Sequence, residues 1–259
     1  MENLRKYGYP PFTVAVVHGG PGAPGEMAPV ARELSSLCGV LEPLQTAGTL
    51  EGQVEELEAV LKENGDIPVT LIGHSWGAML GFILTARHPS LVKKLILVAS
   101  GAFEEKYAVS IMATRLSRLI EKEREEALSL MARFENPGSR NKNKLMARFG
   151  ELMAKADSYS RLTGDIEVLE TSYDINQTVW QQAQELRASG NLLELGEKIE
   201  CPVLAIHGDY DPHLASGVEE PLSRMLKDFK FVLLSKCGHY PWLERNARGR
   251  FYDIIKHEI

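Results

Sequence analysis

The sequence predicts an α/β fold: a mostly parallel central sheet with helices on both faces and a helical cap inserted after the fourth core strand. Two observations lead to this prediction. Apolar runs of strand length alternate with segments of helical periodicity over residues 12–99, the pattern of a parallel sheet covered on both faces. The pattern stops over residues 103–196, which are helical and charged, and resumes at Pro202. We therefore expect a core domain formed by residues 1–102 and 197–259, which carries a cap formed by residues 103–196.

The first part of the core is expected to contain four strands and three helices. Each strand is a short run of apolar, partly β-branched residues, and each helix has apolar residues three or four positions apart. In chain order these elements are strand 12–17, helix 26–38, strand 39–44, helix 50–64, strand 69–72, helix 76–88 and strand 95–99. Gly65 is the expected C-cap of the second helix.

The cap and the last part of the core follow. Charged helical segments fill the cap, and the turn residues Asn136-Pro137-Gly138-Ser139 separate two of them. The expected elements are cap helices 106–122, 123–135, 140–156 and 176–189, core strands 202–206 and 229–234, and a closing helix 246–256.

Composition and charge are those of a soluble globular protein. Of the 259 residues, 44% are hydrophobic and 25% are charged, which is enough for a large core. The net charge of −6 offers no basic face for nucleic acid. The longest apolar stretch, around residues 76–86, is too short to cross a bilayer, and no signal-peptide core is visible at the start. Three widely spaced cysteines suit a reducing compartment. We therefore expect a cytoplasmic protein with no nucleic-acid or membrane partner.

The segment Gly73-His74-Ser75-Trp76-Gly77 carries the strongest chemical signal. It has the pattern Gly-x-Ser-x-Gly and lies between an expected strand and an expected helix. In such a sharp turn the two glycines avoid clashes with the strand and the helix, and the strained backbone lifts the serine hydroxyl above the sheet edge. We predict that Ser75 is a nucleophile; a glycine-rich turn into a core helix is the structural alternative.

A nucleophilic serine needs an imidazole base, and the base needs a carboxylate that orients it. His239 follows the last expected strand, and Asp209 and Asp211 follow the strand before it. The C-terminal ends of parallel strands share one edge of a sheet, so these residues should lie near Ser75. The Gly-x-x-Asp spacing from Gly208 favours Asp211 as the acid and leaves Asp209 as a turn residue. We therefore predict a catalytic triad of Ser75, Asp211 and His239.

Acyl transfer also needs hydrogen-bond donors for the oxyanion that develops on the substrate. The backbone N–H of Trp76, directly after the nucleophile, is one expected donor. The other is expected from the loop His18-Gly19-Gly20-Pro21-Gly22, whose small residues let its backbone approach a substrate oxygen. We predict Gly20 as this second donor and expect His18 to hold the loop by hydrogen bonds.

The same loop also satisfies a dinucleotide-binding pattern. Gly20-Pro21-Gly22-Ala23-Pro24-Gly25 reads G-x-G-x-x-G after a strand, and Glu42 stands near the end of the second strand. Pro21 and Pro24 lack the amide donors that a pyrophosphate needs. A nucleotide site would also leave the three triad residues unexplained. We therefore expect no nucleotide cofactor.

A metal site is the second alternative. His207, Asp209, Asp211 and His213 alternate after a strand. That segment reads as a tight loop without a further ligand group, and the cysteines lack metal-ligand spacing. We expect no metal.

These motifs make the chain resemble the α/β-hydrolase superfamily over nearly its whole length. Within it, His18-Gly19-Gly20-Pro21-Gly22, together with Gly73-His74-Ser75-Trp76-Gly77 and the helical insert, resembles the proline iminopeptidase-like branch. Gly208-Asp209-Tyr210-Asp211 and Gly238-His239 match the superfamily's acid and base positions. The resemblance implies the α/β-hydrolase fold, and it implies the same triad and the same two oxyanion-hole amides.

The sequence departs from that branch in three places. Residues 39–52 read GVLEPLQTAGTLEG where relatives carry an Asp-x-Arg-Gly-x-Gly-x-Ser-like stretch. Only 11 residues precede the first strand, so we expect the antiparallel hairpin at the family's start to be missing. The resemblance also implies acidic cap residues that hold a substrate amine. No local motif selects among the candidates, which are Glu104, Glu105, Glu167 and Glu170.

We expect a cofactor-independent serine hydrolase that cleaves a small ester, amide or short peptide through an acyl-enzyme intermediate. It would be a carboxylesterase or a proline iminopeptidase-like aminopeptidase. The cap would exclude water and shape the pocket. Residues that could line the pocket, or form the core of the cap, are Met112, Leu116, Phe134, Tyr159 and Trp180. The alternative is a non-catalytic small-molecule-binding protein on the same scaffold.

Overall fold

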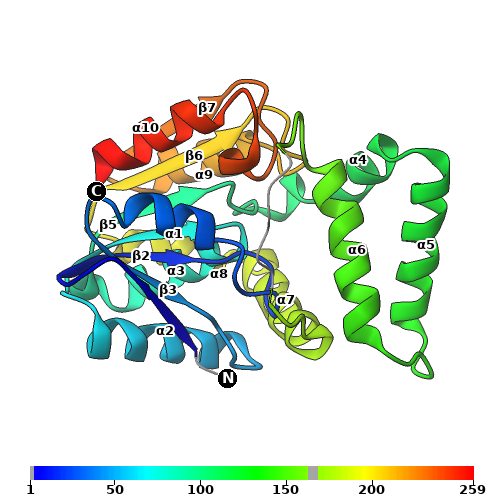
Figure 1. Ribbon diagram of the computed structural model, residues 1–259, viewed down its shortest axis with the longest axis horizontal. Helices are drawn as coiled ribbons and strands as arrows, with labels where there is room; N and C mark the ends of the chain where they lie inside the picture. The colour runs from blue at the N-terminus through cyan, green and yellow to red at the C-terminus, as the bar shows by residue number, and fades with distance from the viewer. Residues whose placement is uncertain (1–2, 163–168) are drawn as a thin grey trace.

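The computed structural model describes residues 3–162 and 169–259 and shows one sheet covered by helices (Figure 1). Its strands are β1 (Leu4–Tyr7), β2 (Phe12–Val17), β3 (Gly39–Pro43), β4 (Val69–His74), β5 (Val92–Val98), β6 (Val203–Gly208) and β7 (Phe229–Leu234). Its α-helices are α1 (Ala28–Leu34), α2 (Leu50–Asn64), α3 (Trp76–Arg87), α4 (Ile111–Arg118), α5 (Glu121–Glu135), α6 (Lys142–Ala156), α7 (Tyr173–Ala188), α8 (Asn191–Glu194), α9 (Ser216–Met225) and α10 (Arg248–Glu258).

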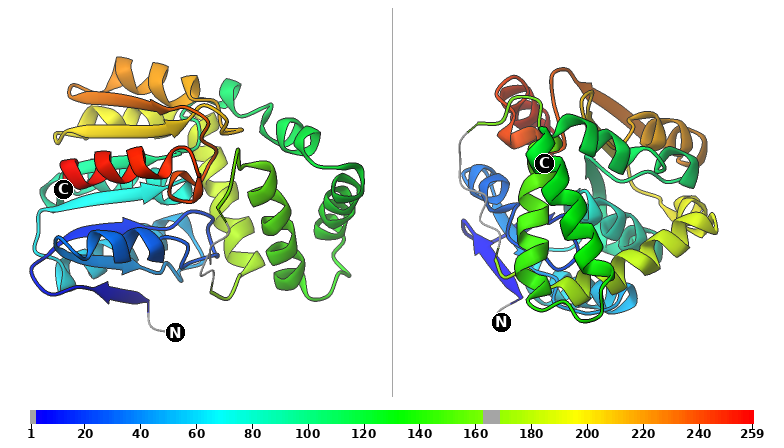
Figure 2. Two further views of the ribbon diagram at one scale, coloured as in Figure 1. Left: turned by 45° about the horizontal axis from the view of Figure 1, so that its top comes forward. Right: turned by 90° about the vertical axis from the view of Figure 1, so that its right-hand side faces the viewer.

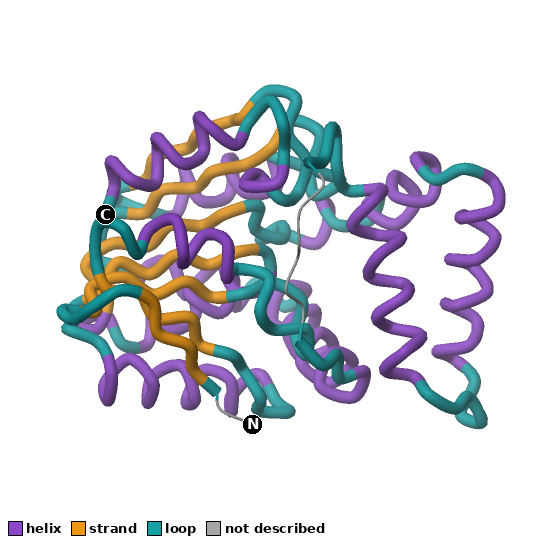
Figure 3. Tube along the Cα trace, in the orientation of Figure 1, coloured by secondary structure: helices purple, strands orange, loops and turns teal. Residues whose placement is uncertain are grey.

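The seven strands pair in the order β1-β3-β2-β4-β5-β6-β7, and only the pair β1–β3 is antiparallel. Figure 3 shows the strands side by side in one sheet with helices around it. After β2 the chain moves outward to β3, and then returns to the other side of β2 to form β4. The order of the strands therefore reverses at β2, and ligands of open α/β sheets bind at the C-terminal ends of the strands next to such a reversal. The structure confirms the predicted fold class.

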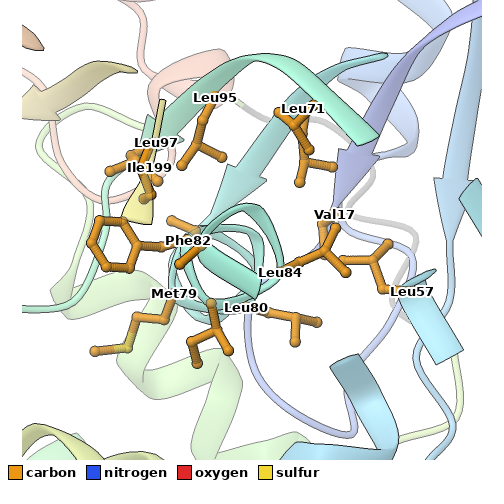
Figure 4. Close-up of a cluster of buried hydrophobic side chains, with 14 of the residues drawn as sticks. Val17, Leu57, Leu71, Met79, Leu80, Phe82, Leu84, Leu95, Leu97 and Ile199 are labelled. Atoms are coloured by element: carbon orange, nitrogen blue, oxygen red, sulfur yellow. The ribbon is translucent and has the colours of Figure 1, made fainter. Parts of the chain in front are cut away.

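Alternate residues of each central strand enter one of two hydrophobic cores. Ala15 and Val17 of β2 face the core beneath α2 and α3, whereas Val14 and Val16 face the core beneath α1 and α10. Helix α3 lies at the centre of the first core and is buried along almost its whole length, as Figure 4 shows. Because both faces of the sheet are covered, β3, β4 and β6 are buried at every position. This burial explains why the strands read as continuous apolar runs.

Helices α4, α5 and α6, which fall in the segment expected to form the cap, lie beyond the C-terminal ends of the parallel strands (Figure 2). Helices α5 and α6 pack together over a small hydrophobic core of their own, which includes Leu130 and Leu152. Helix α7, in contrast, places Val179 and Ala183 in the core beneath α2 and α3. Three of the expected helices agree with α5–α7 to within three residues at each end, whereas α4 is much shorter than the expected helix 106–122. The boundaries of the cap at residues 103 and 196 stay a prediction.

Several elements differ from the expectation. Strand β5 begins at Val92 and not at residue 95, α1 ends at Leu34 and not at residue 38, and the short helix α8 was not expected as a separate element. Strand β1 was not expected, but it forms the antiparallel edge of the sheet, with Leu4 opposite Pro43 of β3. Its sequence, Leu-Arg-Lys-Tyr, is too short and polar to show a strand pattern. Strand β1 pairs with β3 and not with β2, so these two consecutive strands form no hairpin. The sheet nevertheless has an antiparallel strand at its edge. Helix α9 was missed because Pro221 lies inside it.

None of the helices among the described residues is both long enough and apolar enough to cross a membrane.

Candidate active site

The predicted site residues all follow strands at one edge of the sheet. Ser75 comes directly after β4, and the loop with Gly19 and Gly20 follows β2, the neighbour of β4. Asp211 follows β6, and His239 follows β7. Parallel strands with their C-terminal ends at the same edge bring together residues that are far apart in the sequence.

The backbone of Ser75 is strained. Its φ of 51° and ψ of −111° lie outside the regions that non-glycine residues usually adopt, and its N–H donates to the carbonyl oxygen of Val98 at 2.9 Å. Ser75 occupies the N-cap position of α3, but its side chain does not cap the helix. The hydroxyl is therefore held at the tip of the turn without a structural task.

The turn is so tight that both motif glycines are required. A Cβ atom at Gly73 would collide with the backbone of Gly77, and a Cβ atom at Gly77 would collide with the carbonyl oxygens of Val17 and His18. Helix α3 thus begins in direct contact with the end of β2. This contact places the Ser75 turn against the loop that follows β2.

Replacing Gly77 by alanine is expected to lower the free energy of unfolding by about 3 kcal/mol, because the colliding atoms belong to the backbone of β2 and cannot rotate away. Urea unfolding followed by circular dichroism measures the change. The control is Gly249→Ala at an exposed position of α10, where a new Cβ atom meets nothing within 4 Å. This variant should match the wild type or be more stable by up to about 1 kcal/mol. Equal stability of the two variants would contradict the steric explanation.

Asp211 and His239 form a buried pair. Nδ1 of His239 donates to Oδ2 of Asp211 at 2.7 Å, and Oδ1 of Asp211 accepts the N–H of His213 at 2.9 Å. Burial alone would raise the pKa of Asp211, but attraction to His239 and His207 outweighs burial and lowers this pKa well below its ordinary value. Burial alone would lower the pKa of His239, but the charge and hydrogen bond of Asp211 raise it above the ordinary 6.5. The carboxylate thus orients the ring and favours its protonated form.

Ser75 is linked to this pair through its neighbour His74, whose ring lies against the ring of His239. The centroids of these two rings lie 4.8 Å apart. Among the described residues, no hydrogen bond joins Oγ of Ser75 to the imidazole of His239. Catalytic hydrogen bonds are often formed only when substrate is bound. The structure therefore brings the acid and the imidazole together, and the third member of the triad, Ser75, stays a prediction.

Asp209 takes a different position from Asp211. It is exposed, and its Oδ1 accepts the N–H of Cys237 at 3.2 Å, which ties the loop after β6 to the loop after β7. This is the contact of a turn residue, as the spacing predicted.

The loop after β2 is fixed by buried hydrogen bonds. Nδ1 of His18 donates to the carbonyl oxygen of Gly19 at 2.6 Å, and Nε2 accepts the N–H of Gln45 at 3.2 Å. His18 therefore holds the loop, as expected. Gly20 has a left-handed φ of 46°, and Trp76 is the first residue of α3, where backbone N–H groups lack a helical partner. The role of these two amides as oxyanion donors stays a prediction.

Three further residues contact the site and were missed in the sequence. Glu26 accepts the N–H of Gly19 and pairs with His74. Arg115 on α4 forms two hydrogen bonds with Asp157 at the end of α6, at 2.8 and 2.6 Å, and the carbonyl oxygen of Asp157 accepts the N–H of His239. No short-range pattern links residues that are so far apart in the chain, so only the fold reveals these contacts.

The acidic residues considered as amine ligands are mostly engaged elsewhere. Glu104 pairs with Lys106 and Arg224, and Glu105 pairs with Arg187. Glu170 is exposed, and Glu167 lies outside the described residues.

The aromatic and aliphatic residues considered for the pocket pack within hydrophobic cores. Met112, Leu116 and Phe134 pack against the core of the cap, and Trp180 packs against the core beneath α2 and α3. Tyr159 is 46% exposed and stacks edge-on against Tyr210. For the first four residues the structure therefore favours a packing role.

The residues of the two alternative sites also have structural roles. Glu42 is buried and accepts the hydroxyl of Tyr7 at 2.7 Å, so its carboxylate is engaged at the edge of the sheet. Of the alternating loop residues, His207 donates to the carbonyl oxygen of His213 at 2.8 Å. Among the described residues, the candidate metal ligands that come close together are Asp211, His213 and His239, within 4.8 Å of one another. This group already contains the Asp211–His239 hydrogen bond.

Comparisons with known proteins agree with the fold. Over 206 residues the chain is 24% identical to the pimeloyl-[acyl-carrier protein] methyl ester esterase of Neisseria meningitidis, covering 78% of this chain and 71% of that protein. Over 271 residues it is 23% identical to the proline iminopeptidase of Lactobacillus delbrueckii subsp. lactis, and the match covers 90% of this chain and 85% of that protein. Similar solved structures include VinJ, with a TM-score of 0.67 and 17% identity over 98% of this chain and 93% of VinJ. They also include the Mycobacterium smegmatis proline iminopeptidase, with a TM-score of 0.62 and 19% identity. That match covers 98% of this chain and 93% of the iminopeptidase chain.

The family comparison covers most of the chain. Residues 42–245 match the model of the alpha/beta hydrolase fold family, which is more than half of the sequence and includes the Gly-x-Ser-x-Gly turn and both candidate partners. Together with the sheet order and the position of the turn, this match confirms the resemblance drawn from the motifs. The chain belongs to the α/β-hydrolase fold family.

Proposed function

We propose that this protein is a serine hydrolase that cleaves a small ester or amide through an acyl-enzyme intermediate. The observation that carries the proposal is the buried 2.7 Å hydrogen bond between Asp211 and His239, at the sheet edge where Ser75 stands on a strained turn. A buried carboxylate that orients an imidazole next to an otherwise unused hydroxyl is the arrangement that nucleophilic catalysis needs. The esterase and peptidase names of the relatives agree with this chemistry.

The reaction proceeds in two halves. Oγ of Ser75 attacks the substrate carbonyl while Nε2 of His239 takes its proton, and the N–H groups of Gly20 and Trp76 donate to the oxyanion. His239 then gives this proton to the leaving group, and the acyl-enzyme forms. In the second half His239 takes a proton from water, the hydroxide attacks the acyl group, and Ser75 recovers its proton. Asp211 stays ionised throughout and stabilises the protonated ring of His239.

We favour an ester over a peptide with a free N-terminal amine. Holding an ammonium group requires a carboxylate that is not already paired. The buried carboxylates near the site are engaged: Glu26 with His74, Asp157 with Arg115, and Glu244 with the backbone N–H groups of Tyr159, Ser160 and Gly238. A proline iminopeptidase-like activity remains the second candidate, because the iminopeptidase relative matches over 90% of this chain.

We also propose that residues 103–196 act as a cap over the site. The support is the contact of Asp157 and Arg115 with the loops of His239 and His213. Such a cap would keep water from the acyl-enzyme and shape the acyl pocket.

Two assays test the proposal. A fluorophosphonate probe should label the folded protein at Ser75, and a panel of p-nitrophenyl esters and aminoacyl-arylamides, including Pro-arylamide, should give ester turnover. Turnover of Pro-arylamide alone would replace the ester assignment by the iminopeptidase one. A folded protein that the probe does not label, and that turns over no substrate of the panel, would favour the non-catalytic binding protein.

The activity should fall in acid. The base must be neutral to accept a proton, and the pKa of His239 lies above the ordinary 6.5 because of Asp211. As the pH falls through this raised pKa, kcat/KM should fall about tenfold per pH unit. The pKa of Asp211 is lowered, so this carboxylate stays ionised over the same range. The measurement is kcat/KM from about pH 5 to 9, and a flat profile down to about pH 5 would contradict His239 as the base.

A further inference from the structure

Glu26 and His74 form a buried pair that joins three segments of the site. Oε1 of Glu26 accepts the N–H of Gly19 at 2.6 Å and also contacts Nδ1 of His74. Nε2 of His74 lies 2.9 Å from the carbonyl oxygen of His239. Glu26 is 8% exposed and His74 is 1% exposed. The pair thus connects the loop after β2, the residue before Ser75 and the backbone of His239.

The two ring nitrogens of His74 face oxygen atoms on both sides of the ring, which are the carboxylate of Glu26 and the backbone carbonyl of His239. Burial alone would raise the pKa of Glu26, but attraction to His74 outweighs it and the pKa is lowered. The other titratable groups that face the pair are His18, His239 and Tyr240.

The pair is packed directly against the nucleophile. A Cβ atom on Gly19 would lie 2.5 Å from Oε1 of Glu26, 2.8 Å from Nδ1 of His74 and 3.0 Å from Cβ of Ser75. The backbone of Gly19 therefore fills the space between the ion pair and Ser75. A buried ion pair adds little to stability compared with apolar residues of the same size. Apolar residues could not form the hydrogen bonds that this pair makes to the backbone of Gly19 and His239. The specific effect of the pair is therefore to hold that backbone in place.

We propose that the Glu26–His74 ion pair is a positioning unit, which fixes the oxyanion loop and the backbone of His239 relative to Ser75. This inference rests on the proposed serine hydrolase function. Neither residue touches the substrate; both act through the groups that do. The acidic partner comes from the turn before α1, and the basic partner occupies the variable position between Gly73 and Ser75 of the motif.

The test compares Glu26→Gln with Glu42→Gln. Glutamine at position 26 can still accept the N–H of Gly19 but carries no charge. Glu42 is also a buried carboxylate; it lies on β3 and is bonded to Tyr7 of the edge strand β1. We expect Glu26→Gln to lower kcat for a p-nitrophenyl ester by about tenfold to a hundredfold, with KM changed less than about threefold, since a displacement near 1 Å has such effects. Glu42→Gln should stay within about twofold of the wild type, and Glu26→Asp, which keeps the charge, should recover part of kcat.

The rate is to be expressed per serine titrated with the fluorophosphonate probe. A merely structural role of Glu26 would reduce the number of titratable sites and the melting temperature, but it would not change kcat per titrated site. An unchanged kcat per site in Glu26→Gln would therefore overturn the proposal. If the wild type is not labelled at Ser75, it is the hydrolase assignment that fails.

Discussion

Replacing Ser75 by alanine is expected to lower kcat for ester hydrolysis by about 10⁵- to 10⁶-fold and to abolish labelling by a fluorophosphonate. The reason is that Oγ of Ser75 is the atom that forms the covalent intermediate in the proposed mechanism. Without this nucleophile neither acylation nor deacylation can occur. Alanine at this position keeps the Cβ atom, and the hydroxyl makes no capping hydrogen bond in α3. The variant should therefore fold like the wild type, which circular dichroism and thermal unfolding will check.

The matched control is Ser35→Ala. Ser35 also stands at an end of a helix, but its hydroxyl donates to the carbonyl oxygen of Arg32 on the exposed end of α1. This variant should retain full activity and full labelling. If Ser75→Ala keeps substantial activity, or if the probe remains attached to it, another residue must be the nucleophile and the proposed mechanism is wrong.

Replacing Asp211 by asparagine is expected to lower kcat by about 10⁴-fold. Asparagine can still accept the N–H of His213 through its oxygen, but it then presents an NH₂ group to Nδ1 of His239. The imidazole must accept this hydrogen bond at Nδ1, so its single proton moves to Nε2, where it cannot receive the proton of Ser75. The variant also loses the charge that raises the pKa of His239. Both effects act on the base while the shape of the side chain is retained.

Asp209→Asn separates this effect from a general effect of charge. Asp209 lies two positions earlier in the same loop, and its Oδ1 accepts only the N–H of Cys237. Asparagine can keep that hydrogen bond, so kcat/KM should change less than about threefold. Because the two variants remove the same charge from the same loop, the ratio of their rates isolates the contact with His239. A collapse of activity in Asp209→Asn, with activity retained in Asp211→Asn, would reverse the assignment of the acid.

Much of this arrangement is predictable from local sequence. The buried strands read as continuous apolar runs because both faces of the sheet are covered, and helix α2 was predicted with its observed bounds because Val54, Leu57 and Leu61 mark one buried face. The Gly-x-Ser-x-Gly turn was predictable because its two glycines are required by contacts within a few residues of Ser75 and with β2. The spacing after Gly208 also distinguished Asp211 from Asp209.

Other features depend on contacts that no local pattern records. Strand β1 exists because the edge of β3 supplies partners for a short polar segment, and α9 forms despite Pro221 because Val218 and Leu222 pack into the core beneath α2 and α3. The links that join Glu26 to His74 and Asp157 to His239 span large separations along the chain. Their residue types are common on helices and in loops, where they are usually solvated.

The sequence by itself determined the alternation of the central strands and helices, which follows from periodicity, and the Gly-x-Ser-x-Gly turn, which follows from steric needs that act over a few residues. The motifs carried the α/β-hydrolase resemblance and the three residues that we propose as a triad. Only the tertiary structure decided that Asp211 contacts His239, that Glu26 and His74 form a buried pair, and that Asp157, bonded to Arg115, accepts the N–H of His239. The physical reason is that hydrogen bonds and charge pairs depend on distance in space, and the folding of the sheet brings these distant side chains to one edge.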